Sequence, residues 1–226
     1  MGLLDLLFPK ACLNCKKEGV YICSSCLEKL PDIERICPIC ERASIDGFTH
    51  VRCKKKLGLD GLVSLWPYEG VVRKGILALK YKFAREVAYE FAKHIIFELQ
   101  KGNVILPNKA VLIPVPLYWY RENWRGFNQV EEIGGLICEK FGWDINSDLL
   151  VRKRLKKPQT ELKGVDRKKN IKGVFSISPN FKHQILDEKS FILFDDVYTT
   201  GSTLKEATKI LKRNGAKEVW GLTIAR

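Results

Sequence analysis

The stretch that decides the expected fold reads Ile192-Leu193-Phe194-Asp195-Asp196-Val197-Tyr198-Thr199-Thr200-Gly201-Ser202-Thr203. An apolar strand comes first, then two carboxylates, then a turn rich in hydroxyl groups, and then the start of a helix. A strand that ends in acids places them at the carboxyl edge of a sheet, where open α/β sheets bind ligands. The N–H groups and hydroxyls of such a turn suit a phosphate group. The pattern predicts a site for a sugar phosphate with Mg²⁺, and the alternative is a polar turn without a ligand.

Strand and helix patterns alternate through the chain after residue 61. Helices are predicted at residues 71–80 and 85–100, from Asn128 as N-cap to Gly142, and from Ser202 or Thr203 to Gly215. Strands are predicted at residues 62–68, 111–116, 148–151, 174–177, 191–197 and 219–224. This alternation predicts an α/β fold, with a mostly parallel sheet flanked by helices. His94 lies off the apolar stripe of its helix and is expected to be exposed, whereas Cys138 is expected in the core.

The composition is that of a globular protein. The chain has 226 residues, of which 46% are hydrophobic and 29% are charged. No apolar run is long enough to span a bilayer, so membrane insertion is not expected. Residues 1–8 are apolar but short, carry an acid and lack a basic leader, which makes them a poor signal peptide. We therefore expect a cytoplasmic protein.

Seven of the eight cysteines precede residue 54, and with one histidine they form four knuckles of metal-ligand spacing. Eight ligands make two tetrahedral zinc sites without an open position, so the two zinc ions are expected to be structural. An iron–sulfur cluster is a weaker alternative, because it favours cysteine throughout. The pairing is either sequential or crossed. In the sequential arrangement the ligands are Cys12, Cys15, Cys23 and Cys26 at one site and Cys37, Cys40, His50 and Cys53 at the other. Residues 1–58 are the predicted metal module.

A strongly basic segment lies between residues 152 and 172. The chain has a net charge of +13, and this segment holds ten Lys or Arg residues but only Glu161 and Asp166 as acids. Such a concentrated excess predicts an anionic partner, which is diphosphate, nucleic acid or both. The alternative is a solvated loop on a generally basic protein.

The segment 192–203 resembles the phosphoribosyl-pyrophosphate (PRPP) loop of type I phosphoribosyltransferases, in which two acids and two variable residues precede Thr-Thr-Gly-x-Thr. Other segments extend the resemblance to the ComF family of competence-associated proteins. They are the cysteine-rich start, Ile113-Pro114-Val115-Pro116-Leu117, Arg125-Gly126-Phe127-Asn128-Gln129 and Pro158-Gln159. Two departures from the family pattern are small: His50 replaces the usual Cys, and Lys156 stands where Thr is frequent.

The resemblance implies a type I phosphoribosyltransferase fold over residues 59–226, with its core at 111–226 and a mobile catalytic lid at 152–173. It makes Asp195 and Asp196 the catalytic pair that faces the ribose hydroxyls and Mg²⁺. The remaining PRPP-binding residues are Val197, Tyr198, Thr199, Thr200, Gly201, Ser202 and Thr203. The expected diphosphate-binding residues are Leu117, Tyr118, Arg121 and Arg125, and the expected lid residues are Gln159, Arg167 and Lys168.

The loop after Pro116 is rich in aromatic residues, namely Tyr118, Trp119, Tyr120, Trp124 and Phe127. One interpretation is a stacking platform for a base. The other is hydrophobic packing over the edge of the sheet.

The resemblance also implies a role in natural competence and in handling single-stranded DNA, beside a competence helicase or other DNA-processing proteins. Two functions remain open: a Mg²⁺-dependent phosphoribosyltransferase with an unknown acceptor, and a non-catalytic PRPP sensor that binds single-stranded nucleic acid. An RNA-binding zinc protein with a degenerate transferase scaffold is a weaker third. Purine salvage is disfavoured, because Thr199 stands where purine-salvage enzymes usually carry an Asp that contacts the base.

Overall fold

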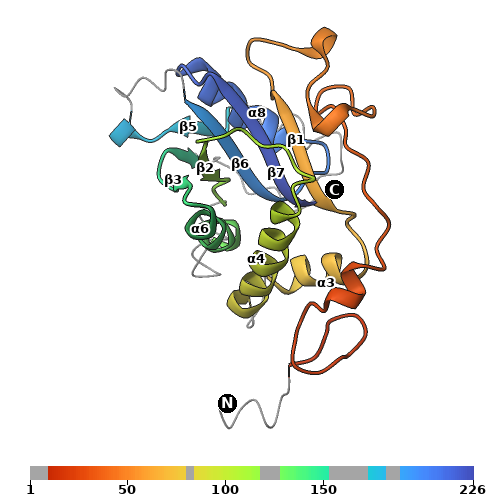
Figure 1. The fold of residues 1–226 in the computed structure, drawn as a ribbon. Coiled ribbons are helices and arrows are strands. Elements are labelled where there is room, and N and C mark those ends of the chain that lie inside the picture. Colours follow the sequence, from red (N-terminus) through yellow and green to blue (C-terminus); the bar gives the residue numbers. More distant parts are fainter. Residues whose placement is uncertain (1–9, 80–83, 118–127, 153–172, 182–188) are drawn as a thin grey trace.

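The computed structural model describes residues 10–79, 84–117, 128–152, 173–181 and 189–226. A parallel sheet lies at the centre of this part of the chain, with the strand order β1-β7-β6-β2-β3 (Figure 1). Its strands are β1 (Gly61–Trp66), β2 (Val111–Pro114), β3 (Asp144–Ile145), β6 (Ser190–Val197) and β7 (Glu218–Ala225). The predicted fold class, α/β with a mostly parallel sheet flanked by helices, is confirmed.

β6 is the central strand, and its sequence explains why. Side chains alternate between the two faces of a strand. Phe191 and Leu193 pack into the core on one face, and Ile192 and Phe194 pack into the core on the other. A strand covered on both faces has to be apolar throughout, as these four residues are. The chain becomes polar only at Asp195, where β6 reaches the edge of the sheet.

Helices cover both faces of the sheet. On one face lie α3 (Gly70–Ala78), α4 (Ala84–Gln100) and α6 (Gln129–Phe141). Asn128 caps α6 as predicted, because its side chain accepts a hydrogen bond from the Val130 N–H at 3.3 Å. The other face carries α8 (Ser202–Arg213) and a separate antiparallel pair, β4 (Leu150–Arg152) with β5 (Phe175–Ile177), followed by the short helix η3 (Pro179–Phe181).

The cysteine-rich segment 10–58 has little regular structure. It contains α2 (Ser24–Leu27) and the short 3₁₀ helices η1 (Ile45–Gly47) and η2 (Val51–Cys53). The segment runs past the outer edge of β1 (Figure 1), where the Arg35 guanidinium donates to the Ser64 carbonyl at 2.7 Å. Phe48 also forms a β-bridge with Gly61. The metal-binding part of the chain therefore covers an edge strand, which is otherwise open to pairing with other molecules.

Three details differ from the sequence-based predictions. The prediction for His94 was wrong, because it is half-buried and its Nε2 lies 2.9 Å from the Ile22 carbonyl oxygen. The segment 10–58 packs on α4 and covers that side chain. The strand β3 was missed, since a two-residue strand exists only through its pairing with β2. The helix predicted at 71–80 is Gly70–Ala78, with Lys80 outside the described residues. Cys138 is buried as expected.

No helix among the described residues is both long enough and apolar enough to cross a membrane.

Candidate ligand site and metal centres

The two predicted catalytic carboxylates lie at the carboxyl end of β6, between the ends of β2 and β7. Asp195 is in register with Thr223 of β7, and both acids are half-buried. Asp195 accepts a hydrogen bond from the Asp196 N–H at 2.9 Å, and Asp196 accepts one from the Val197 N–H at 2.7 Å. The strand therefore delivers a close pair of acids to the edge where α/β sheets bind ligands.

Electrostatics at this edge favour a cation. Burial at the end of the sheet and the neighbouring charge of Asp196 raise the pKa of Asp195 well above its ordinary value. The N–H group of Asp196 and the more distant charge of Arg152, on β4, oppose this shift. An oxygen-seeking cation such as Mg²⁺ would relieve the repulsion between the two carboxylates. The donor set therefore fits a magnesium ion.

The turn after β6 presents hydroxyl groups at the start of α8. Gly201 adopts a left-handed backbone with φ of 63°, and its carbonyl oxygen accepts the first α8 hydrogen bond from the Lys205 N–H at 2.8 Å. The hydroxyl oxygens of Thr200 and Ser202 are 2.8 Å apart, and Thr199 is exposed. Hydroxyls and unpaired N–H groups at a helix N-terminus are suited to a phosphate.

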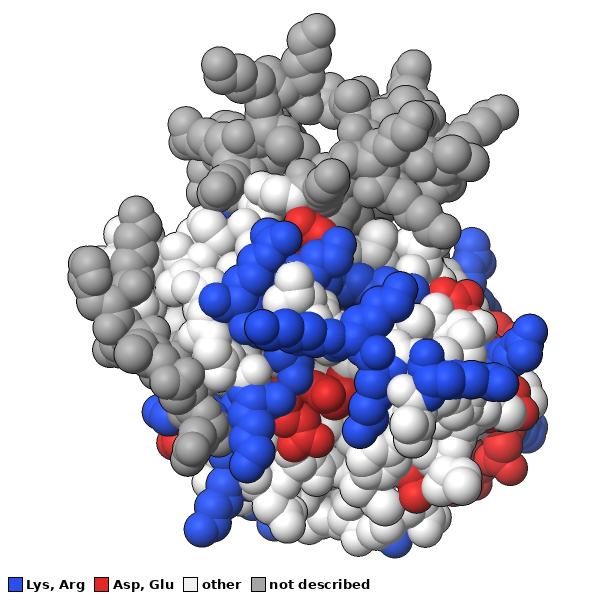
Figure 2. All heavy atoms as spheres, turned by 90° about the horizontal axis from the view of Figure 1, so that it is seen from above, with Lys and Arg blue, Asp and Glu red and all other residues white. Residues whose placement is uncertain are grey.

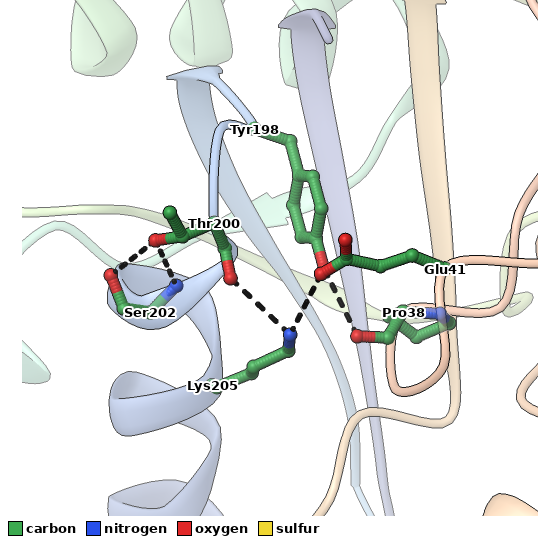
Figure 3. Close-up of polar contacts among 6 residues, drawn as sticks. All are labelled: Pro38, Glu41, Tyr198, Thr200, Ser202 and Lys205. Carbon is green, nitrogen blue, oxygen red and sulfur yellow. Dashed lines mark hydrogen bonds and ion pairs between the residues drawn. The ribbon is translucent and has the colours of Figure 1, made fainter. Parts of the chain in front are cut away.

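This turn is attached to the segment that carries the second cysteine cluster (Figure 3). The Tyr198 hydroxyl donates to the Pro38 carbonyl oxygen at 3.0 Å. The Lys205 ammonium lies 3.3 Å from the Thr200 carbonyl oxygen and 3.4 Å from a carboxylate oxygen of Glu41. Sequence reasoning missed these contacts, because no local pattern links residues near 40 with residues near 200.

The other predicted ligand residues are only partly described. Leu117 follows β2 and is half-buried. The Val115 N–H donates to the Phe194 carbonyl oxygen at 2.8 Å, and this hydrogen bond holds the end of β2 beside β6. The predicted diphosphate residues Tyr118, Arg121 and Arg125 lie outside the described residues, with the rest of the aromatic loop.

The expected lid, 152–173, is described at its two ends only; Gln159, Arg167 and Lys168 lie outside the described residues. Arg152 is the last residue of β4, so the strand extends one residue further than predicted.

The Gly173 N–H donates to a carboxylate oxygen of Glu206 on α8 at 2.8 Å. Burial raises the pKa of Glu206, but the Gly173 N–H and the Lys209 ammonium outweigh burial, so the net shift is downward.

The eight predicted zinc ligands form two separate groups in the sequential arrangement. One group is Cys12, Cys15, Cys23 and Cys26, and the other is Cys37, Cys40, His50 and Cys53. Within each group the ligand atoms lie within 4.8 Å of one another. A zinc ion with sulfur ligands at about 2.3 Å has tetrahedral edges of about 3.8 Å.

The observed spacings fit that tetrahedron. The Sγ atoms of Cys12 and Cys26 are 3.9 Å apart, and those of Cys15 and Cys23 are 3.6 Å apart. Both distances are too long for a disulfide bond. Backbone N–H groups help to hold Cys12 as a thiolate: burial raises its pKa, but the N–H groups of Cys15, Asn14 and Cys23 outweigh burial and lower the pKa to about 6. The pKa of Cys23 is shifted upward instead, mainly by burial.

His50 is oriented for zinc binding by its second nitrogen. Its Nδ1 lies 3.3 Å from the Cys40 Sγ, while its Nε2 lies 3.0 Å from the Ala43 carbonyl oxygen. A carbonyl oxygen only accepts, so Nε2 carries the proton and Nδ1 presents its lone pair to the metal. Histidine as the fourth ligand favours zinc over an iron–sulfur cluster at the second site, because most such clusters are held by cysteine throughout.

Positive charge gathers on one face of the molecule around a few acids (Figure 2). On α8, Lys209 pairs with Glu206 at 2.9 Å and Lys212 pairs with Asp60 at 2.7 Å, so part of the positive charge of that helix is neutralised. Residues 37–56, which carry the second group of zinc ligands, form the second metal segment. Exposed cations also lie on this segment, at Arg42, Arg52, Lys54, Lys55 and Lys56. A surface of this kind favours anionic partners.

Comparison with known proteins agrees with the metal centres. Residues 3–55 match the model of the double zinc ribbon domain. The chain is 39% identical to Competence protein F of Haemophilus influenzae over half of each protein. It is 28% identical to the DNA utilization protein YhgH of Escherichia coli over 96% of this chain and 98% of that protein. With Competence protein ComFC of Bacillus subtilis it shares 28% identity over 93% of this chain and 86% of that protein.

The chain belongs to the ComF family. Among solved structures, this ComF family protein is similar over 59% of its length to an adenine phosphoribosyltransferase from Leishmania tarentolae, with 17% identity and a TM-score of 0.34; the match covers 54% of that chain. A hypoxanthine phosphoribosyltransferase from Staphylococcus aureus is similar over 62% of either chain, with 13% identity and a TM-score of 0.36.

Proposed function

We propose that this ComF family protein binds PRPP together with Mg²⁺ at the carboxyl edge of its sheet. The observation that carries the proposal is the arrangement at the end of β6, where two adjacent carboxylates precede a turn with hydroxyls and the N-terminus of α8. Asp195 and Asp196 would hold the ribose hydroxyls and the hydrated cation, and residues 199–203 would hold the 5′-phosphate. The turn and the acids together account for the 5′-phosphate and the ribose of the same ligand.

The reaction proposed for the site is transfer of the phosphoribosyl group. The bond between the anomeric carbon and the diphosphate would break, and an acceptor would take the place of the diphosphate. The protein would lower the barrier by holding the charged groups in place and by excluding water. Mg²⁺ would supply charge neutralisation on the leaving diphosphate. Leu117, Tyr118, Arg121 and Arg125 are the proposed contacts for that diphosphate, and Gln159, Arg167 and Lys168 are the proposed lid residues.

Titration calorimetry with PRPP and MgCl₂ tests the binding step. We expect saturable binding by the zinc-loaded chain and its loss in the Asp195→Asn/Asp196→Asn double variant. A matched control is Asp144→Asn, an acid in the exposed edge strand β3, which should bind as the wild type does. Absence of heat with the wild-type protein would refute the proposal.

A non-catalytic PRPP sensor is the second candidate, because the acceptor is not defined by any described residue. Labelled PRPP separates the two functions. Steady release of diphosphate in the presence of nucleoside, amine or nucleic-acid acceptors identifies a transferase. Tight binding with no release above the rate without protein identifies a sensor.

We also propose that the protein contacts single-stranded DNA during competence. The exposed cations of the second metal segment and the basic segment 152–172 support this, as do the names of the relatives. Replacing Lys54, Lys55 and Lys56 by Gln should weaken binding of a labelled oligonucleotide. It should also flatten the salt dependence by about 0.7 in log–log slope for each phosphate that is no longer neutralised.

The control for this experiment replaces the same number of cations elsewhere on the surface. Arg85 and Lys93 on α4 and Lys101 just after it serve this purpose, because they belong to another element than the second metal segment. The control variant should bind the oligonucleotide with the wild-type salt slope. An unchanged slope in the Lys54–Lys56 variant would exclude those three residues from the DNA contact.

We propose that the functional protein contains two structural zinc ions. Their thiolate ligands are stable in a reducing compartment, which supports a cytoplasmic role. A competence helicase or another DNA-processing protein is the proposed macromolecular partner.

A further inference from the structure

We propose that the second zinc site holds the turn 198–203 in its ligand-binding conformation, with Tyr198 as the positioning residue that joins them. This inference rests on the proposed PRPP site and assigns Tyr198 a different task from ligand contact. Its side chain points toward Pro38 (Figure 3), whereas its backbone belongs to the turn between β6 and α8.

Tyr198 is held at both ends. Its backbone N–H donates to the Ala225 carbonyl oxygen of β7 at 2.9 Å, and its hydroxyl donates to the Pro38 carbonyl oxygen at 3.0 Å. The side chain is only 3% exposed, and its ring lies directly against Gly201. Movement of Pro38 would therefore move the ring, and the ring would move the turn at Gly201.

Pro38 lies in the knuckle between Cys37 and Cys40, whose thiols belong to the second metal group. The knuckle is closed by hydrogen bonds from the Glu41 N–H to the Cys37 carbonyl at 2.8 Å and from the Cys37 N–H to the Arg42 carbonyl at 2.9 Å. Such a short loop contains no helix or strand and carries two of the four ligands of its group, so we expect its shape to depend on the metal. Loss of the metal would release Pro38 as a fixed acceptor.

A second, weaker link runs through Lys205, whose ammonium joins the Thr200 carbonyl to Glu41. The Lys205 side chain is 29% exposed and that of Glu41 is 52% exposed, so solvent screens this ion pair. The hydrogen bond of the buried Tyr198 hydroxyl is the dominant link.

Coupling between two sites is reciprocal: if the metal favours ligand binding at the turn, the ligand must favour retention of the metal by the same factor. The first metal group serves as the control for this coupling. Cys12, Cys23 and Cys26 pack in the core shared with α3 and α4. Zinc at the first site should therefore have no effect on the turn.

Hydrogen exchange of the full-length, ligand-free chain tests the structural half of the inference. Tyr198→Phe keeps all eight zinc ligands and the ring, and removes only the hydroxyl. We expect amide exchange at 199–205 to rise about three- to tenfold, the range that one net hydrogen bond represents. Cys53→Ser, at the second site, should raise it at least as much, and Cys15→Ser, at the first site, should leave it unchanged. Unchanged exchange in Tyr198→Phe would overturn the inference.

Zinc transfer to a chromophoric chelator, with and without PRPP and MgCl₂, tests the coupling. Zinc release from the two sites should give two kinetic phases. The phase that is missing in Cys53→Ser is the release from the second site. PRPP should slow that phase in the wild type and in Tyr89→Phe, a matched change on α4, but not in Tyr198→Phe. If PRPP binds yet leaves the phase unchanged in the wild type, the inference is wrong. If PRPP does not bind at all, the proposed function fails, and hydrogen exchange alone decides whether zinc positions the turn.

Discussion

Gly201 lies so close to Tyr198 that a side chain at Gly201 would overlap the tyrosine ring and hydroxyl. Gly201 also has a φ of 63°, a left-handed conformation that other residues adopt only at a cost. Two separate constraints, backbone conformation and space, therefore require glycine at this position. The tight turn between the acids and α8 depends on both.

Gly201→Ala should lower the free energy of unfolding more than the same substitution at a left-handed glycine that has open space around it. Gly142→Ala is the matched control, because Gly142 has a φ of 64° with open space around it. The control should cost about 1–2 kcal/mol of unfolding free energy from backbone strain. Gly201→Ala should cost a further 1–3 kcal/mol, roughly, from overpacking against Tyr198. Urea denaturation measures both, and equal losses would contradict the packing argument.

Asp195→Asn should stabilise the fold near neutral pH while it abolishes binding of PRPP with Mg²⁺. The raised pKa means that the native state holds a proton that the unfolded state has released, so stability falls as pH rises from the ordinary Asp value to the raised one. Asparagine carries no charge and escapes this loss. The difference in melting temperature between variant and wild type should therefore shrink as pH falls. Zinc sites are common to both proteins, so their response to acid cancels in the difference.

Each metal group should hold one zinc ion independently. Metal analysis of the purified chain should give two zinc ions per chain, and about one in either Cys12→Ser or Cys37→Ser. Cys12→Ser should unfold at a clearly lower temperature, since Cys12 is fully buried in the core shared with α3 and α4. Retention of two ions in either variant would show that the replaced cysteine is not a required ligand, and loss of both ions from one variant would contradict independent sites.

Glu90 should anchor residues 12–26, the segment that carries the first group of zinc ligands, to α4. One of its carboxylate oxygens accepts the N–H groups of both Tyr21 and Ile22, each at 2.7 Å. Glu90→Ala leaves the two N–H groups without this acceptor and should cost about 2–3 kcal/mol, as for hydrogen bonds to charged groups. The control is Glu86→Ala, which removes only a surface ion pair with Lys10 and should cost less than about 1 kcal/mol. Faster zinc release from the first site in Glu90→Ala, but not in the control, would support the anchor.

Much of the fold was predictable because its signals are local. The apolar run 191–194, covered on both faces, indicates a central strand of a parallel sheet. Asn128 and Gly142 mark the ends of α6 through capping chemistry that involves only neighbouring residues. The knuckle spacing of the cysteines, with His50, predicts two four-ligand groups for the same reason, since each knuckle is a short loop.

The sequence alone determined the alternation of the longer strands and helices, the acids at the end of β6, the glycine-containing turn and the candidate metal ligands. The tertiary structure decided that the ligands group sequentially, that His94 contacts Ile22, and that Tyr198 reaches Pro38, 160 residues away. The physical reason is that capping, side-chain alternation and knuckle spacing depend on residues a few positions apart. Contacts between a metal segment and a sheet edge depend instead on which surfaces meet once the core has packed.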